Sequence, residues 1–600
     1  MFQNVSVLPL ALTKPRVRRH SARVTKHLLL AAALIVVLAG PRPAAQTGAF
    51  VPVTQQMLLN PGPDDWLMVS RTYDQQRFSP LRQITRENVG RLRVEWVRGM
   101  AAGAQESVPL VYRGVMYLVS PGAGVLALDA TNGDILWEYR RKLPADVVPA
   151  ASRSKTLAIF EDLIYFTAPD GYLVALDART GNVRWETFVI DPKTRGVHSS
   201  GPMVVDGKVL SGRTCNETRA GCFVSAHDAN TGEELWKFYT SAAPGDPGGD
   251  SWGDTPVNQR VASTWGLPGS YDPARNLTFW GVANPIPFTR AERHGGNPDG
   301  TSRSAPSDLY SNSTVAIDVA TGKLAWYYQH LPGDDWDLDS AHERMLLRLP
   351  INPDPSAVKW INPTIPRGQE RDVVVTVAEG GGIWVLDRAD GKFLWATPFP
   401  YDVPDFNLSG IDVDTGRTHI NWDKVLKKPG ERAVTCFYNI RSYWPLAYHP
   451  GKTSLYIPYA DSCLDMTAGG PRFGIPRPGT DPAKFAGMAK VNLSTGRVDW
   501  RHQQWAPGNG AVVATAGDVV FWGDLNRRFK AFDADTGKVL WETVVGGIVS
   551  VSTITYAVNG KQYVAVMTGE GQTGTTRLLD QLPGFKPVRG HNAVYVFALP

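Results

Sequence analysis

A short motif, Asp or Asn-x-x-x-Gly-x-x-x-Trp, recurs along this chain of 600 residues and constrains its fold more than any other feature. The sequence holds seven copies, and glycine and tryptophan stand four residues apart in each. The copies are Asp129…Gly133…Trp137, Asp177…Gly181…Trp185, Asp228…Gly232…Trp236, Asp318…Gly322…Trp326, Asp387…Gly391…Trp395, Asn492…Gly496…Trp500 and Asp533…Gly537…Trp541. Such a repeat predicts similar supersecondary units packed side by side.

Each copy has the residue types of a tight turn between two strands. Two β-rich runs, 115–119 and 125–128, precede the first copy. Asp and Thr side chains hydrogen-bond the local backbone in such turns, and glycine takes angles that a Cβ atom would forbid. We therefore predict a hairpin at every copy, with the tryptophan facing inward and wedged between neighbouring sheets.

The spacing of the copies indicates the architecture. Intervals of 48, 51 and 41 residues between successive glycines fit one four-stranded blade per unit. Longer intervals of 90, 69 and 105 residues require insertions or a unit whose motif is lost. Seven units, plus one formed by residues near Trp96 and the terminal strand 594–599, predict an all-β, eight-bladed β-propeller. A seven-bladed ring with long loops is the alternative.

The first 45 residues are typical of a signal peptide. They contain seven Lys or Arg residues, no acidic residue, and an apolar run over 28–39. That run is shorter than the roughly 20 residues of a membrane span. We expect cleavage near Ala45, a single propeller domain over 46–600, and no stable membrane span in the mature chain. The whole chain carries +5 and the mature part −2, so nothing favours nucleic-acid binding.

The four cysteines allow three disulfide pairings. Cys215 and Cys222 are close in sequence, and pairing them would leave Cys436 with Cys463. An exported protein can oxidise such pairs. No Cys-x-x-Cys-His segment occurs in the sequence, so we expect no covalent c-type haem.

The repeats resemble the tryptophan-docking motifs of the pyrroloquinoline-quinone (PQQ) alcohol dehydrogenases, the methanol and ethanol dehydrogenase family, in its form without a haem domain. Segments 76–81, 87–92, 514–517 and 560–566 also resemble family segments. The resemblance implies that PQQ lies in a central funnel beside one metal ion. An aspartate base would take the alcohol proton while hydride moves to the quinone.

The same resemblance implies five residues that contact PQQ. Trp265 matches the tryptophan that forms the floor under the quinone ring, where a flat apolar face suits stacking. The complete set is Glu106, Arg153, Ser199, Trp265 and Asn509.

Four residues match the metal site of the family: Glu217, Asn284, Asp337 and Asp339. Asp337, which follows Trp336, also matches the catalytic base. Asp339 stands where lanthanide-using members carry an extra carboxylate. Carboxylate and amide oxygens suit hard cations, and both Ca²⁺ and a lanthanide remain open. If the segment is extended, residues 337 and 339 point to the same side.

Several positions depart from the family pattern. By the resemblance, Glu379 stands where most relatives have Arg or Lys beside the quinone; either a gap displaces this alignment, or another cation such as Arg441 serves. Ser442 and Tyr443 replace a common Asn-Trp pair, and the adjacent cysteines of the best-known members are absent from 145–153. The family's structural disulfide matches Cys436–Cys463.

These features lead to one functional hypothesis and one alternative. The hypothesis is a periplasmic PQQ-dependent dehydrogenase that oxidises an alcohol and passes electrons to an external cytochrome c-type acceptor. The alternative is a non-catalytic propeller scaffold of the outer-membrane assembly type, which the docking repeats alone would equally fit. The sequence does not specify the alcohol.

Overall fold

The predicted hairpins are present in the computed structural model. The structure describes residues 49–147, 154–192, 196–569 and 581–600 apart from 583, 587 and 589. At the first motif, strands β5 (Gly124–Asp129) and β6 (Ile135–Arg140) pair antiparallel. Asp129 Oδ1 accepts hydrogen bonds from the backbone N–H of Thr131 at 2.8 Å and from its hydroxyl at 2.6 Å. The motif's residues therefore close the turn as predicted.

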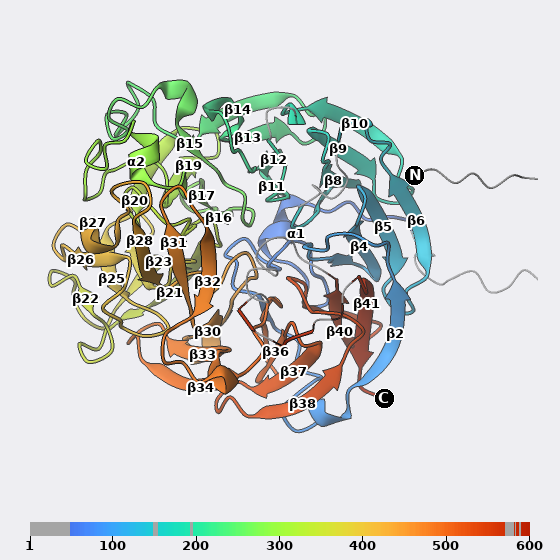
Figure 1. Cartoon of the computed structure of the whole chain (residues 1–600). Coiled ribbons are helices and arrows are strands. Elements are labelled where there is room, and N and C mark those ends of the chain that lie inside the picture. The colour runs from blue at the N-terminus through green and yellow to red at the C-terminus, as the bar shows by residue number, and fades with distance from the viewer. Residues whose placement is uncertain are drawn as a thin grey trace, which may run out of the picture. The chain divides into compact units, whose positions relative to one another are not determined.

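The described strands form eight sheets of four or five strands, arranged around a ring within residues 45–600 (Figure 1). Within each sheet the strands are named in their order across the sheet. The first sheet consists of β2 (Arg93–Gly99), β41 (Ala593–Ala598), β40 (Lys561–Thr568) and β39 (Ile554–Val558), and the second of β3 (Leu110–Tyr112), β4 (Val115–Ser120), β5 and β6. The third consists of β7 (Ala158–Phe160), β8 (Leu163–Thr167), β9 (Tyr172–Asp177) and β10 (Val183–Phe188), and the fourth of β11 (Pro202–Val205), β12 (Lys208–Ser211), β13 (Phe223–Asp228) and β14 (Glu234–Tyr239). The fifth sheet consists of β16 (Ser270–Asp272), β17 (Leu277–Gly281), β19 (Ser313–Asp318) and β20 (Leu324–Gln329), and the sixth of β21 (Met345–Ile351), β23 (Gln369–Val377), β24 (Ile383–Asp387), β25 (Phe393–Thr397) and β22 (Trp360–Ile361). The seventh consists of β29 (Ala447–His449), β30 (Ser454–Ala460), β33 (Ala486–Asn492) and β34 (Val498–Gln504), and the eighth of β1 (Phe78–Ser79), β35 (Val513–Thr515), β36 (Val519–Gly523), β37 (Arg528–Asp533) and β38 (Val539–Val544). The all-β propeller prediction is confirmed, and the eight-blade count is our interpretation of these sheets.

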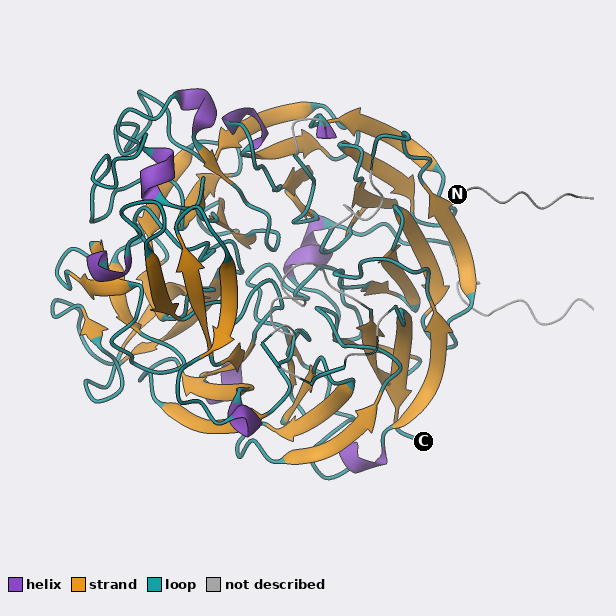
Figure 2. Cartoon of the chain, viewed as in Figure 1, coloured by secondary structure: helices purple, strands orange, loops and turns teal. Residues whose placement is uncertain are grey.

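Smaller elements lie between or beside these sheets, and strands far outnumber helices in the described residues (Figure 2). The small sheets are β15 (Val261–Ala262) with β18 (Pro285–Ile286), β26 (Leu408–Ile411) with β27 (Thr418–Ile420), and β28 (Arg432–Cys436) with β31 (Ser462–Thr467) and β32 (Arg472–Pro476). The short helices are α1 (Gln55–Leu59), α2 (Arg290–Arg293), η1 (Val89–Arg91), η4 (Arg219–Gly221), η5 (Val257–Gln259), η6 (Trp422–Lys424), η7 (Pro450–Lys452) and η8 (Pro482–Lys484). No helix in the described residues has the length and apolar character needed to cross a membrane.

The two ends of the described chain share one sheet, as the sequence predicted. Strand β2 pairs antiparallel with β41. Trp96 of β2 packs against Gly133 of the first motif, and its ring N–H donates to the carbonyl of Ala130 at 3.2 Å. The N-terminal strand therefore supplies the outer strand of the sheet that closes the ring.

Four docking tryptophans bridge to the next motif through a ring that covers its glycine and a ring N–H that donates to a nearby backbone carbonyl: Trp137, Trp185, Trp236 and Trp500. The ring N–H of Trp137 donates to the carbonyl of Ala178 at 3.0 Å, and its six-membered ring covers Gly181. The same arrangement recurs between Trp185 and Gly232. The inward wedge expected from the sequence is confirmed.

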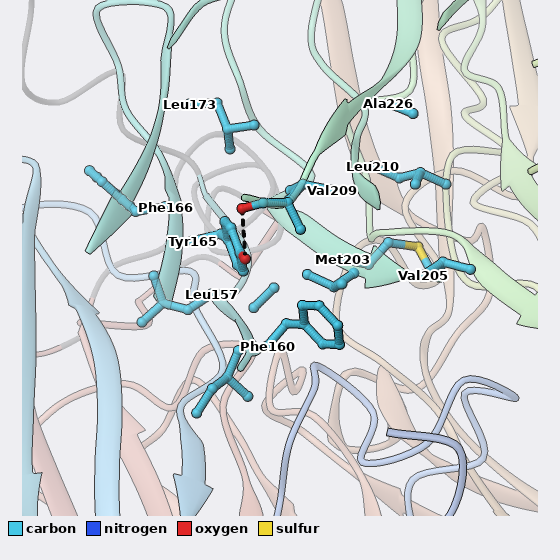
Figure 3. Packing of buried hydrophobic residues seen from close by; sticks show 14 of the residues in the cluster. Leu157, Phe160, Tyr165, Phe166, Leu173, Met203, Val205, Val209, Leu210 and Ala226 are labelled. Carbon is cyan, nitrogen blue, oxygen red and sulfur yellow. Dashed lines mark hydrogen bonds between the residues drawn. The ribbon is translucent and has the colours of Figure 1, made fainter. Parts of the chain in front are cut away.

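Apolar side chains fill the space between neighbouring sheets. Figure 3 shows this packing between the sheet that contains β8 and the sheet that contains β12. The side chains labelled there are Leu157, Phe160, Tyr165, Phe166, Leu173, Met203, Val205, Val209, Leu210 and Ala226. Such dry contacts make the ring a rigid support for the loops at its centre.

Both disulfides considered from the sequence are formed. Cys215 and Cys222 are bonded with their Cα atoms 5.3 Å apart. Cys436 of β28 is bonded to Cys463 of β31, its direct partner in the strand register, with a Cα separation of 4.4 Å. The second bond links two strands of the small three-stranded sheet.

The docking contact predicts a stability difference between two glycines. Gly181 has φ +73°, and an added Cβ would lie 2.5 Å from Trp137 Cε3. Gly207 has φ +69° but open space where a Cβ would stand. Gly181→Ala should therefore cost about 2 kcal/mol more than Gly207→Ala, because both strain the backbone but only the first displaces a packed ring. Thermal unfolding of the two variants measures this, and equal melting temperatures would contradict it.

Candidate active site

The acidic segment around Asp337 is buried in the described structure rather than exposed as a surface turn. Asp334 shapes it by accepting three hydrogen bonds. Its carboxylate receives the backbone N–H of Trp336 and of Leu338, both at 2.7 Å, and the side-chain amide of Asn312 at 2.8 Å. These bonds fold the backbone around the Asp334 side chain and present Asp337 with φ +67°.

The expectation of an extended segment is therefore wrong at Asp337, because a left-handed residue breaks the alternation of strand side chains. The carboxylates of Asp337 and Asp339 nevertheless interact. Burial, and then the charge of Asp337, raise the pKa of Asp339. The backbone N–H of Asn284 donates to Asp339 Oδ1 at 3.0 Å, which joins three of the four expected metal ligands in one place.

The chemistry of this group fits a hard cation. Two buried carboxylates that repel each other gain from a shared positive ion. The side-chain N–H of Asn284 donates to the carbonyl of Pro285 at 3.0 Å, which makes the amide oxygen the atom suited to a cation. Among the described residues, no three acidic, histidine or cysteine side chains converge. Glu217 is exposed in the loop closed by the Cys215–Cys222 bond, so its role as a ligand stays a prediction.

A second group gathers around Glu106. This carboxylate is buried and accepts hydrogen bonds from the ammonium of Lys155 and, at 2.8 Å, from the hydroxyl of Tyr443. Lys155 is fully buried, and its Nζ atom lies 4.3 Å from the ring centroid of Tyr443. Three segments far apart in sequence thus meet through their charged and aromatic side chains.

Trp265 joins the two groups. Its ring packs edge-on to Tyr443, with centroids 5.6 Å apart, and Lys155 Nζ lies 5.8 Å from its centroid. Its indole also lies beside the carboxylate of Asp339 and acts to lower the pKa of that group, against the larger effect of burial. The tryptophan therefore contacts both the Glu106 group and the acidic group.

The remaining expected contacts lie elsewhere or outside the described residues. Ser199, buried just before β11, accepts a hydrogen bond from the hydroxyl of Thr214 at 2.8 Å. Asn509 is buried between β34 and β35, and its backbone carbonyl accepts a hydrogen bond from the backbone N–H of Val551 at 2.7 Å. Arg153 lies outside the described residues. These three positions stay predictions.

Glu379 is also buried, beside the acidic group. Its backbone N–H donates to the carbonyl of Asp339 at 3.1 Å, and its carboxylate accepts the hydroxyl of Ser442 at 3.2 Å. His342 Nε2 lies 3.6 Å from this carboxylate. Burial, with the nearby charge of Arg441, lowers the pKa of His342, so the imidazole is neutral and the contact is not an ion pair.

Arg441 does not supply the cation that Glu379 displaces. Its guanidinium donates to the carboxylate of Glu343 at 2.6 Å and to the carbonyl of Val377 at 2.7 Å. Both contacts are buried, so the two terminal nitrogens of Arg441 already have partners in the framework.

Sequence reasoning missed two basic residues of this region. Lys155 stands two positions beyond Arg153, and a lone lysine before the apolar stretch 157–160 was the available signal. Arg472 of β32 contacts Asp337, with Nη1 2.8 Å from Oδ2. Nothing local in the sequence marks Arg472, because the contact depends on where the β31–β32 hairpin lies.

Comparison with known proteins agrees with this geometry. The family model of the PQQ "Glucose/ethanol/alcohol dehydrogenase, beta-propeller domain" matches residues 66–404 and 483–564. The quinohemoprotein alcohol dehydrogenase ADH-IIG of Pseudomonas putida is 31% identical over 91% of this chain and 78% of its own length. The dehydrogenase subunit of the quinone alcohol dehydrogenase of Gluconobacter oxydans is 32% identical over 92% of this chain and 76% of its own length.

Comparison with solved structures also finds dehydrogenases of this kind. A europium-containing methanol dehydrogenase superposes with a TM-score of 0.78 at 28% identity, covering 90% of this chain and 99% of that one. Fold and comparisons together define a β-propeller oxidoreductase of the kind that uses PQQ and one metal ion. The chain belongs to the family of PQQ-dependent alcohol dehydrogenases. The non-catalytic scaffold is accordingly set aside.

Proposed function

We propose that this chain oxidises an alcohol to an aldehyde or ketone, using PQQ and one metal ion. One observation carries the proposal: Trp265 contacts both the Glu106–Lys155–Tyr443 group and the Asp339 carboxylate. An aromatic face beside paired acids is the arrangement that a flat quinone with an adjacent cation requires.

The residues would divide the work as follows. Asp337 accepts the proton of the substrate hydroxyl at a carboxylate oxygen. Bound PQQ would supply the two-electron acceptor for the hydride of the carbinol carbon. Glu217, Asn284, Asp337 and Asp339 would hold the metal ion. The cofactor contacts would come from Glu106, Arg153, Ser199, Trp265 and Asn509, to which the structure's geometry adds Lys155 and Tyr443.

The metal ion is proposed to be a lanthanide in preference to Ca²⁺. Asp339 adds a second carboxylate beside Asp337, and Asn284 adjoins it. A trivalent ion gains more than a divalent ion from each anionic ligand. The europium-containing methanol dehydrogenase supports this assignment by its structural similarity.

Export and electron transfer complete the proposal. The basic and then apolar segment 1–45 would direct the chain to the periplasm, where the two disulfides persist. Electrons would pass to an external cytochrome c-type acceptor, because the sequence has no Cys-x-x-Cys-His site.

Reconstitution tests the proposal. The purified chain would be loaded with PQQ and either Ca²⁺ or La³⁺, and dye reduction followed with primary, secondary and ring alcohols. We expect turnover that requires both PQQ and metal and is faster with La³⁺. No turnover with any alcohol under either metal would contradict the function.

The stacking role of Trp265 makes a separate prediction. Trp265→Ala should weaken PQQ binding by about tenfold or more, since stacking on an aromatic ring contributes about 1–3 kcal/mol. Fluorescence or absorbance titration with PQQ measures the affinity. Trp505→Ala is the matched control, because Trp505 is 37% exposed and packs on Phe585 instead. Equal PQQ affinities in the two variants would exclude the role of Trp265.

A further inference from the structure

The small sheet β28–β31–β32 places a basic side chain, Arg472, against the proposed catalytic base Asp337. Arg472 Nη1 lies 2.8 Å from Asp337 Oδ2, and the two side chains are only 19% and 10% exposed. Arg472 belongs to segment 405–482, which lies between the two stretches that the family model matches. That segment holds two strands of a main sheet, β29 and β30, as well as the small sheet that carries Arg472.

The contact is held from two sides. Arg472 pairs with Met466 across the β31–β32 hairpin, and its guanidinium carbon lies 4.1 Å from the ring centroid of Phe288. Phe288 follows β18 and stands four residues after Asn284. The Cys436–Cys463 bond fixes β31 to β28 in the same sheet. Arg472 is thus a constrained side chain rather than a loose surface arginine.

The other buried cations of the region have different partners. Lys155 is bonded to Glu106, and Arg441 to Glu343. Arg344 donates to the hydroxyl of Thr314 at 2.6 Å and to backbone carbonyls. Arg472 differs from these three cations in that its ion pair is with Asp337.

We propose that Arg472 is the positioning residue for Asp337 and takes the role that the family resemblance gives to a basic residue at position 379. Through this ion pair with one carboxylate oxygen, the guanidinium limits rotation of the base. This inference rests on the proposed function of Asp337. It adds that the chain carries the positive charge on the β31–β32 hairpin instead of at position 379.

The arrangement has two consequences of opposite sign. A guanidinium against a metal ligand repels an incoming cation, so its removal should tighten metal binding. The same removal frees the carboxylate to rotate, so turnover should fall. A merely structural role would weaken both properties together.

The test uses Arg472→Met in the full chain. In the absence of PQQ, Tb³⁺ affinity is measured from luminescence sensitised by tryptophan, and we expect it to rise about tenfold. In the PQQ-loaded enzyme we expect kcat to fall about tenfold or more, with KM nearly unchanged. Arg472→Lys, which keeps the charge, should retain most of both wild-type properties.

The control is Arg432→Met on β28 of the same sheet. Arg432 pairs with Asp465 and is 66% exposed, so its loss should change neither Tb³⁺ affinity nor kcat. Adding Glu379→Lys to Arg472→Met should regain about tenfold in kcat, and failure to regain turnover would overturn the replacement.

Two further results would overturn the positioning role: absence of Tb³⁺ binding to the wild type, or a Tb³⁺ affinity that Arg472→Met leaves unchanged or weakens. If the wild type binds Tb³⁺ but shows no turnover with PQQ, the proposed function fails. The Tb³⁺ comparison would still decide whether Arg472 opposes a cation at Asp337.

Discussion

Replacing Asp337 with alanine should reduce kcat by about 100- to 10,000-fold, which is the contribution of a positioned general base. The fold should survive. The surrounding loop is shaped by Asp334, which accepts the hydrogen bonds of Trp336, Leu338 and Asn312. Steady-state turnover at saturating metal, PQQ and alcohol measures the effect.

Two companion variants separate chemistry from strain. Asp337→Asn keeps a residue that tolerates the left-handed φ of +67° while it removes the base. It should lose as much turnover as the alanine variant. Asp402→Ala removes an exposed carboxylate that pairs with Lys359 at 2.8 Å and should leave kcat unchanged. Turnover within tenfold of wild type in Asp337→Asn would refute Asp337 as the base.

Replacing Asp339 with alanine should separate the two metals. We expect lanthanide affinity to fall by about 100-fold or more and Ca²⁺ affinity to fall less, because a trivalent ion loses more with each anionic ligand. The variant also relieves the repulsion that, with burial, raises the pKa of Asp339. Competition titrations with La³⁺ and Ca²⁺ on the full chain measure both affinities.

Asp339→Asn is the matched variant for this prediction. It keeps an oxygen at the same place without the charge, so its lanthanide affinity should lie between those of the wild type and the alanine variant. Equal losses for Ca²⁺ and La³⁺ would show that Asp339 supports the loop rather than selecting the ion.

The propeller could be predicted because its signal is local and repeated. The turn at Asp129 and Gly133 is closed by side chains within five residues of each other. The docking of Trp137 on Gly181 follows from the same spacing in the next unit. The seven motifs left one blade to be formed from segments near the two chain ends, so the sheet that joins those segments could also be predicted.

The site was predictable only in part. Asn284, Asp339, Trp265 and Glu106 were found through motif matches, and the structure places them in one connected region. The backbone geometry of Asp337 could not be predicted, because three hydrogen bonds to the Asp334 carboxylate override the alternation of an extended strand.

Sequence reasoning missed two basic residues, for different reasons. The loose match near 153 hid Lys155, which the structure places in the Glu106 group. Arg472 reaches Asp337 through the position of a hairpin, which no local pattern encodes. The long-range placement of such a hairpin is the part that one sequence does not specify.

The central claim is that this chain transfers hydride from an alcohol to bound PQQ with Asp337 as the base. The most direct measurement is the absorbance of PQQ after alcohol is mixed anaerobically with the metal-loaded holoenzyme, without an external acceptor. We predict one equivalent of reduced PQQ per bound cofactor in the wild type and none on the same timescale in Asp337→Asn. PQQ that stays oxidised in the wild type, or is reduced equally fast in the variant, would contradict the claim.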